Sequence, residues 1–233
     1  MSGNNYPPSV ACNICDDIGW LYPVVNHKPD YSHVVECSCR RRDPERAFRL
    51  LKWTDLPEGT EDRTFQSYEI RSEAHKVACQ SAMKVAEELK GSLLLTGPSG
   101  TGKSHLALAA IRRRIEIAIE GKDTVLNKLG KYVFVPDLLD MLRAGFKATE
   151  STESYDWLLR QYCNVGLLAL DDLGTETPTP WAREKLDQVM DHRWLRKLPT
   201  IVTTNEPPSV FRQRRQTRIL DSKLDSHNGW STV

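Results

Sequence analysis

The sequence has little that points to a membrane or to export. In its 233 residues, no apolar run approaches the roughly 18 consecutive residues that a membrane-spanning helix requires. Its N-terminus, Met-Ser-Gly-Asn-Asn-Tyr-Pro-Pro, lacks the basic and then apolar order of a signal peptide. There is also no excess of one charge, because 32 Lys and Arg stand against 31 Asp and Glu. We therefore expect a cytoplasmic protein without membrane contact, whose partners must be inferred from local motifs.

Composition divides the chain into three regions. Residues 1–42 are rich in Cys, Pro, His and aromatic residues, and residues 43–90 form a connector with helical apolar spacing near 43–53 and 72–90. Residues 91–233 alternate between short apolar runs and amphipathic stretches. We expect strands at 92–96, 132–135, 166–170 and 199–203, and helices at 103–120, 136–147, 155–162 and 181–196. This alternation predicts an α/β domain with a mostly parallel sheet flanked by helices.

A phosphate-binding loop follows the first of these strands. The loop reads Gly97-Pro98-Ser99-Gly100-Thr101-Gly102-Lys103-Ser104, a full match to G-x-x-x-x-G-K-[ST]. Glycines let the backbone wrap closely around phosphates, and the following helix directs its positive end at them. Lys103 would contact the β and γ phosphates, and the Ser104 hydroxyl would bind Mg²⁺. The sequence therefore predicts an ATP site.

Acidic residues end the third expected strand. Leu167-Leu168-Ala169-Leu170 is followed directly by Asp171 and Asp172. In P-loop ATPases the first acid at this position holds the Mg²⁺ ion, and an adjacent acid accepts a proton from the attacking water. We assign these roles to Asp171 and Asp172 respectively. Asn205, at the end of the 199–203 strand, is a further candidate that would reach the attacking water.

Four of the six cysteines gather near the N-terminus. Cys12 and Cys15 form one pair, and Cys37 and Cys39 form a second. Two close thiolate pairs joined by a loop can converge on one tetrahedral Zn²⁺ ion that stabilises a segment too small for its own core. His27 and His33 lie between the pairs, and either could replace a cysteine ligand. Two disulfides or four separate thiols are the alternatives, but without an export signal zinc is favoured.

The assembled motifs resemble those of the DnaC/DnaI-type helicase loaders and their relatives, the IstB-type transposition ATPases. The matching segments are Cys12-Asn-Ile-Cys15-Asp-Asp-Ile-Gly19, Arg63-Thr64-Phe65, the loop through His105, Leu170-Asp-Asp-Leu-Gly174 and Thr203-Thr-Asn205. The resemblance implies an AAA+ P-loop NTPase over residues 91–233, after a connector at 43–90 and a small zinc-binding module at 1–42. It also adds His105 to the nucleotide-binding residues.

The resemblance further implies partners. Such loaders grip a replicative hexameric DNA helicase through the N-terminal module. Their ATPase domains associate side by side, with ATP between neighbours. The helical insert after the second strand, here around Asp137–Tyr162, engages single-stranded DNA, and Arg143 and Lys147 are the candidate phosphate contacts within it. Contacts of this kind are sensitive to salt and largely independent of sequence.

One motif departs from the family pattern. Near the C-terminus the chain reads Arg218-Ile-Leu-Asp221-Ser222-Lys223-Leu224, with lysine where the family carries the arginine that completes a neighbour's site. Lysine cannot form the same planar two-point contact with a phosphate. Either Arg218 takes this role or activation between subunits is weak, so Arg218 and Lys223 both stay candidate catalytic residues.

These observations predict an ATP-dependent helicase loader that places a replicative helicase on single-stranded DNA during replication initiation. An IstB-like ATPase that regulates DNA transposition is the first alternative, although those relatives more often begin with helices than with a cysteine module. An adaptor that binds ATP and barely hydrolyses it is the second, because of Lys223.

Overall fold

The computed structural model describes residues 20–25, 28–29, 35–37, 46–120, 128–147, 152–175, 179–207 and 230–232. Its N-terminal part contains two short antiparallel pairs. Strand β1 (Trp20–Leu21) pairs with β4 (Val35–Glu36), and β2 (Val24–Val25) pairs with β3 (Lys28–Pro29) between them. The chain therefore turns back on itself, which brings Trp20 opposite Glu36.

A parallel sheet of five strands forms the centre of the described chain. In spatial order the strands are β6 (Gly130–Phe134), β7 (Leu167–Asp171), β8 (Thr200–Thr204), β5 (Ser92–Thr96) and β9 (Trp230–Thr232). Every neighbouring pair in this sheet is parallel. The carboxyl ends of parallel strands meet at one edge, which is where ligands bind in open α/β sheets. The segments that follow β5, β7 and β8 therefore come together there.

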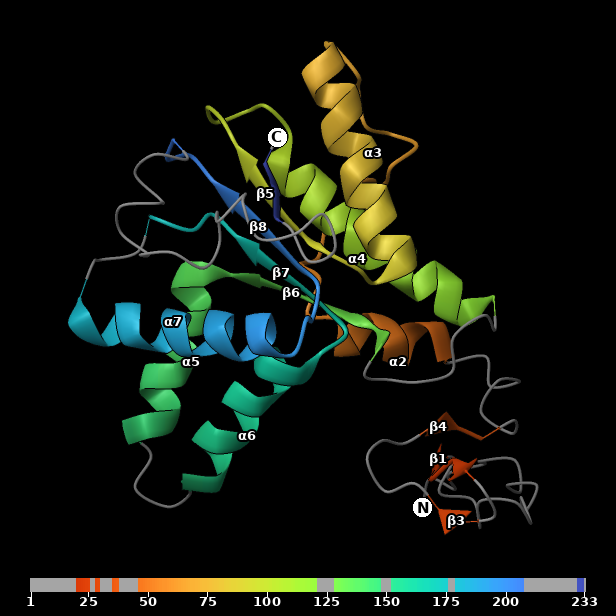
Figure 1. The fold of residues 1–233 in the computed structure, drawn as a ribbon, viewed down its shortest axis with the longest axis vertical. Coiled ribbons are helices and arrows are strands. Elements are labelled where there is room, and N and C mark those ends of the chain that lie inside the picture. Colours follow the sequence, from red (N-terminus) through yellow and green to blue (C-terminus); the bar gives the residue numbers. More distant parts are fainter. Residues whose placement is uncertain are drawn as a thin grey trace, which may run out of the picture.

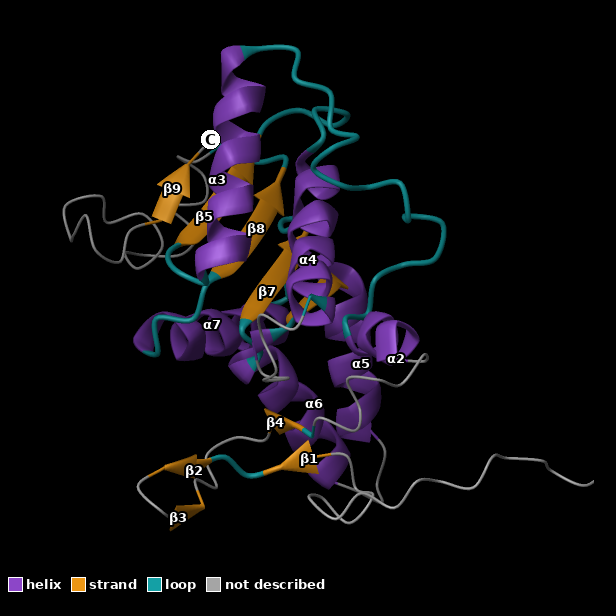
Figure 2. Ribbon diagram, turned by 90° about the vertical axis from the view of Figure 1, so that its right-hand side faces the viewer, coloured by secondary structure: helices purple, strands orange, loops and turns teal. Residues whose placement is uncertain are grey.

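Helices cover both faces of the sheet (Figures 1 and 2). Helices α3 (Glu73–Glu88) and α4 (Lys103–Ile119) pack on one face. Helices α5 (Val135–Lys147), α6 (Thr152–Asn164) and α7 (Pro180–Leu195) pack on the other. Side-chain caps set where two of them begin: the Ser72 hydroxyl accepts from the His75 amide at 3.2 Å, and the Thr179 hydroxyl accepts from the Ala182 amide at 3.1 Å.

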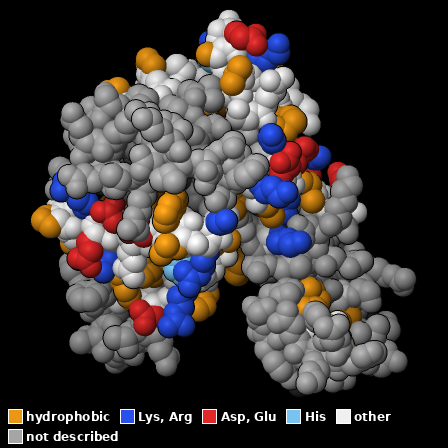
Figure 3. All heavy atoms as spheres, viewed as in Figure 1, with side chains coloured by type: hydrophobic (Ala, Val, Ile, Leu, Met, Phe, Trp, Pro, Cys, Tyr) orange, Lys and Arg blue, Asp and Glu red, His pale blue; other side chains and the backbone are white. Residues whose placement is uncertain are grey.

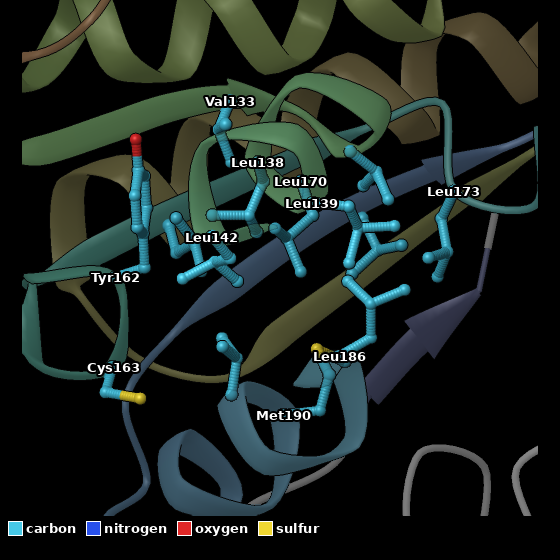
Figure 4. Packing of buried hydrophobic residues seen from close by; sticks show 14 of the residues in the cluster. Val133, Leu138, Leu139, Leu142, Tyr162, Cys163, Leu170, Leu173, Leu186 and Met190 are labelled. Carbon is cyan, nitrogen blue, oxygen red and sulfur yellow. The ribbon is translucent and has the colours of Figure 1, made fainter. Parts of the chain in front are cut away.

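Strands β5, β6, β7 and β8 divide their side chains between two hydrophobic cores. Leu93 and Leu95 of β5 pack with α3 and α4, whereas Leu94 packs with α5, α6 and α7. This alternation follows from the two-residue period of a strand and explains why the runs are apolar throughout. Figure 4 shows the second core, in which Leu138 and Leu142 of α5 lie between the sheet and the helices opposite.

The connector docks on the edge of the sheet through α2 (Arg46–Trp53) and the residues that follow it. Leu50 of α2 packs against Ile115 and Ala118 near the end of α4. The carbonyl of Thr54 then accepts the Tyr132 amide at 2.9 Å, which satisfies a main-chain donor on the open edge of β6. The first part of the connector is thus joined to the parallel sheet by both packing and backbone bonding.

The predicted fold class is confirmed, with strands and helices in the expected order. Several elements differ from the expectation by more than one residue. Strand β6 begins at Gly130, two residues before the expected start, and α6 spans Thr152–Asn164 where 155–162 was expected. Strand β9 and the short strands β1 to β4 were not predicted. The described part of the chain contains no helix that is both long and apolar enough to cross a bilayer.

Candidate nucleotide-binding site

The loop between β5 and α4 has the backbone that a phosphate cradle requires. Gly97, Gly100 and Gly102 adopt φ values of 144°, 81° and 87°, a region that L side chains rarely occupy. Pro98, Ser99 and Gly100 form its exposed tip, and the Thr101 hydroxyl donates back to the Pro98 carbonyl at 2.9 Å. Helix α4 begins at Lys103, so its unpaired amides lie directly after the loop. The loop and helix end therefore fit an anionic phosphate.

Lys103 lies against its own loop. Its ammonium donates to the carbonyls of Gly97 and Pro98, both at 2.8 Å. Burial lowers the pKa of Lys103, while the carboxylates of Asp172 and Asp171 act in the opposite direction. A cation held by a glycine-rich loop and influenced electrostatically by two acids is suited to a phosphate–Mg²⁺ group. The Ser104 hydroxyl is exposed in the first turn of α4.

Asp171, at the end of β7, is almost fully buried and held by two hydroxyl groups. The Thr203 hydroxyl donates to Oδ1 at 2.6 Å, and the Tyr132 hydroxyl donates to Oδ2 at 2.5 Å. Burial, followed by the charge of Asp171, raises the pKa of Tyr132, which favours the protonated phenol that donates this hydrogen bond. One donor comes from each neighbouring strand, which fixes the direction of the carboxylate.

Asp172 follows with an unusual backbone and a different set of partners. Its φ is 59°, a left-handed value that aspartate tolerates better than most residues. Its amide donates to the Thr203 hydroxyl at 2.8 Å, and its Oδ1 accepts from the Asn205 side-chain amide at 3.0 Å. The structure thus brings together Asp171, Asp172 and Asn205 as the sequence predicts.

A segment of the connector lies beside the loop, and sequence reasoning gave it no role there. The Tyr68 ring occupies the space next to Gly102, where an added Cβ would lie 2.7 Å from Cε2 of Tyr68. Its hydroxyl donates to the Thr101 carbonyl at 3.4 Å. His105 Nε2 lies 2.7 Å from the Thr64 carbonyl, and its ring packs edge-on against Tyr68 at 5.2 Å between centroids. The observed contacts of His105 therefore hold the connector, and a contact with nucleotide stays a prediction.

Tyr132 and Tyr68 were missed, although each carries a signal. A tyrosine inside an apolar strand needs a partner for its hydroxyl. Only the fold shows that this partner is Asp171, 39 positions along the chain.

Several predicted site residues lie outside the described residues, namely Arg218, Lys223, Cys12, Cys15 and Cys39. Of the four predicted zinc ligands, Cys37 is described, and it is buried. Among the described residues, no group of three or more His, Cys, Asp or Glu side chains could hold a metal ion. The zinc site stays a prediction.

The parallel sheet with its flanking helices and the P-loop define a nucleotide-binding domain of the AAA+ class. A match to the family of IstB-like ATP binding proteins covers residues 26–225. The chain belongs to that family, which confirms the resemblance inferred from the motifs.

Known relatives and structures agree with this assignment. The replicative helicase loader DnaC of Escherichia coli K12 is 26% identical over 170 residues, which cover 72% of this chain and 65% of DnaC. The chain thus spans less than two thirds of the length of that relative. The crystal structure of the DnaC helicase loader has a TM-score of 0.58 at 22% identity and covers 76% of this chain and 99% of that one. AMPPCP-bound DnaA from Aquifex aeolicus has a TM-score of 0.56 at 18% identity and covers 74% and 50%. These structural likenesses concern the fold.

Proposed function

We propose that the protein hydrolyses ATP and uses its nucleotide state to load a replicative hexameric DNA helicase onto single-stranded DNA. The observation that carries the ATPase proposal is a pair of adjacent carboxylates with different partners, both of which act electrostatically on Lys103 of the P-loop. Asp171 is buried and accepts hydrogen bonds from two hydroxyl groups, whereas Asp172 is partly exposed and accepts one hydrogen bond from the side-chain amide of Asn205. Neighbouring acids in different environments can take different roles.

Each residue of the site has its own role in the proposed hydrolysis of ATP. Bound Mg²⁺-ATP supplies the phosphoryl group that water attacks. Lys103 holds negative charge on that group, and Ser104 and Asp171 would hold the Mg²⁺ ion. Asp172 accepts the proton of the attacking water. Asn205 donates to Asp172 Oδ1 at 3.0 Å, which orients the carboxylate toward that task.

Membership of the family and the similarity to DnaC support the loader part of the proposal. The N-terminal module would bind the helicase, with Zn²⁺ held by Cys12, Cys15, Cys37 and Cys39. Of these four residues the structure describes Cys37, which directly follows β4 and is buried.

Helices α5 and α6 are the proposed contact with single-stranded DNA. On this insert, the Arg143 guanidinium donates to Asp140 at 2.8 Å and lies 5.1 Å from the centre of the Trp181 ring. A phosphate would replace Asp140 as its partner, and Lys147 would add a second charge. Basic and acidic side chains of the described residues lie interspersed on the face seen in Figure 3, so DNA contact would depend on such local groups.

The loader proposal is tested by size-exclusion chromatography with light scattering on mixtures with the host's replicative helicase, with and without ATP. We expect a stoichiometric complex that is lost when residues 1–42 are deleted. If no complex forms under either condition, the hypothesis of a helicase loader is wrong. The hypothesis to examine is then a DNA-bound ATPase that regulates transposition.

The ATPase proposal is tested by steady-state turnover with and without single-stranded DNA. Lys103→Ala removes the charge that stabilises the transferring group and should lower kcat by about 10²–10³-fold. Turnover that survives this substitution would refute the site. Nucleotide binding without turnover in the wild-type protein would favour the adaptor.

A further inference from the structure

The carboxylate of Asp171 has little freedom of its own. Only 4% of the residue is exposed, and each oxygen already accepts one hydroxyl hydrogen bond. A carboxylate oxygen has two lone-pair directions, so each oxygen keeps one for a further ligand. The two hydroxyls therefore determine where Asp171 can offer an oxygen to a metal ion.

Of these two hydroxyls, that of Tyr132 comes from the edge strand β6. Its ring is buried in the core shared with α3 and α4, and its hydroxyl extends to Asp171 from two residues further back along the strand register. The bond of 2.5 Å is at the short end of the range for a hydroxyl donor and a charged acceptor.

The connector fixes the main chain that carries this ring. The amide of Tyr132 donates to the carbonyl of Thr54, which is fully buried. Next to it, the Lys131 ammonium donates to the Trp53 carbonyl at 2.6 Å and to Asp55 at 2.7 Å. Tyr132 is thus held on one side by the connector and holds Asp171 on the other.

We propose that Tyr132 is a positioning residue for the Mg²⁺ site, a role that rests on the proposed Mg²⁺-ATP binding by Asp171. Its hydroxyl turns one carboxylate oxygen toward the metal position and prevents Asp171 from rotating away. Groups that orient a metal ligand in this way typically change metal affinity by about 10–100-fold when they are removed.

The test compares Tyr132→Phe with Tyr162→Phe. Tyr132→Phe keeps the ring and its packing and removes only the hydroxyl. Tyr162→Phe is a matched control, because Tyr162 is also buried and donates to a carboxylate, that of Asp55 at 3.4 Å. Binding of a fluorescent ATP derivative is measured in EDTA and then over a Mg²⁺ titration.

We expect the Mg²⁺ concentration at half-saturation to rise about tenfold in Tyr132→Phe, with the affinity in EDTA unchanged. Tyr162→Phe should match the wild-type protein in both measurements. An unchanged Mg²⁺ midpoint in Tyr132→Phe would overturn the proposal, and so would an equal loss of affinity in EDTA, which indicates a general structural role. If the wild-type protein binds no nucleotide, or binds it without any effect of Mg²⁺, the proposed function itself fails.

Discussion

Gly102 is the residue of the P-loop that can least accept a side chain. Its φ of 87° disfavours any Cβ, and an added Cβ would also lie 2.7 Å from the Tyr68 ring. Gly59 has a similar φ of 75°, but nothing lies within 4 Å of its Cβ position. Gly59→Ala should therefore cost about 1–2 kcal/mol of unfolding free energy from backbone strain alone. Gly102→Ala should cost more and should also weaken ATP binding.

Denaturant unfolding and nucleotide titration of both variants check this prediction. Gly59 lies in the connector loop, so its substitution should leave ATP affinity unchanged. Equal losses of stability in the two variants would show that the Tyr68 contact does not constrain the loop.

Thr203 joins the two acids of the site through one hydroxyl. It donates to Asp171 Oδ1 and accepts from the amide of Asp172. Thr203→Val keeps the shape of the side chain and removes both bonds, so we expect kcat for ATP hydrolysis to fall about tenfold or more. Affinity for nucleotide in EDTA should hardly change, because neither bond touches the loop.

Thr200→Val is the matched control for this substitution. Thr200 is equally buried at the other end of β8, where its hydroxyl accepts from Arg193 at 2.9 Å. This variant should lose stability and keep its turnover. If both valine variants lose activity to the same degree, the effect comes from the strand as a whole and not from the acids.

At the scale of elements, the strands and helices with a full apolar period could be predicted from the sequence, and those that depend on distant contacts could not. Strand β6 was expected to start at Tyr132, and the structure extends it back to Gly130 through the charged Lys131. It starts earlier because Asp55 and the Trp53 carbonyl bind the Lys131 ammonium. Strand β9 is a three-residue segment that pairs with β5, far back in the chain.

The contact between Lys131 and the connector leads to a prediction about how the connector is attached. Lys131→Met removes two hydrogen bonds from a side chain that is only 5% exposed, and should lower the free energy of unfolding by about 1–3 kcal/mol. Hydrogen exchange at the Tyr132 amide should quicken, because its acceptor Thr54 is no longer held. Lys185→Met is the control: its partner Glu184 is 69% exposed, so the loss should be under about 1 kcal/mol. Equal effects in both variants would contradict a specific attachment of the connector through Lys131.

At the scale of the whole molecule, the zinc-binding module predicted at residues 1–42 rests on the sequence, because the structure describes Cys37 but not Cys12, Cys15 or Cys39. We expect purified protein to contain one equivalent of Zn²⁺ per chain, measured by elemental analysis. Cys37→Ser should lower this content, while Cys79→Ser, which alters a buried cysteine of α3, should not. Removal of Zn²⁺ by a chelator should abolish helicase binding and spare ATP binding, since the P-loop lies in a different region. A metal content that is the same in both serine variants would exclude Cys37 as a ligand.

Arg218 and Lys223 are the two candidates for completing the ATP site of a neighbouring subunit, a role that the resemblance to helicase loaders implies. Arg218 can contact phosphate oxygens through a planar fork, whereas Lys223 offers a single point charge. We therefore expect Arg218→Ala to lower turnover strongly and Lys223→Ala to lower it less. If Arg218 acts on the adjacent subunit, mixing Arg218→Ala with Lys103→Ala should restore part of the activity. In such a mixture an intact loop of one chain can meet an intact arginine of the other.

Steady-state turnover across a range of mixing ratios measures this rescue. A mixture that stays inactive at every ratio would show that Arg218 does not act between subunits, and rescue with Lys223→Ala instead would assign the role to the lysine.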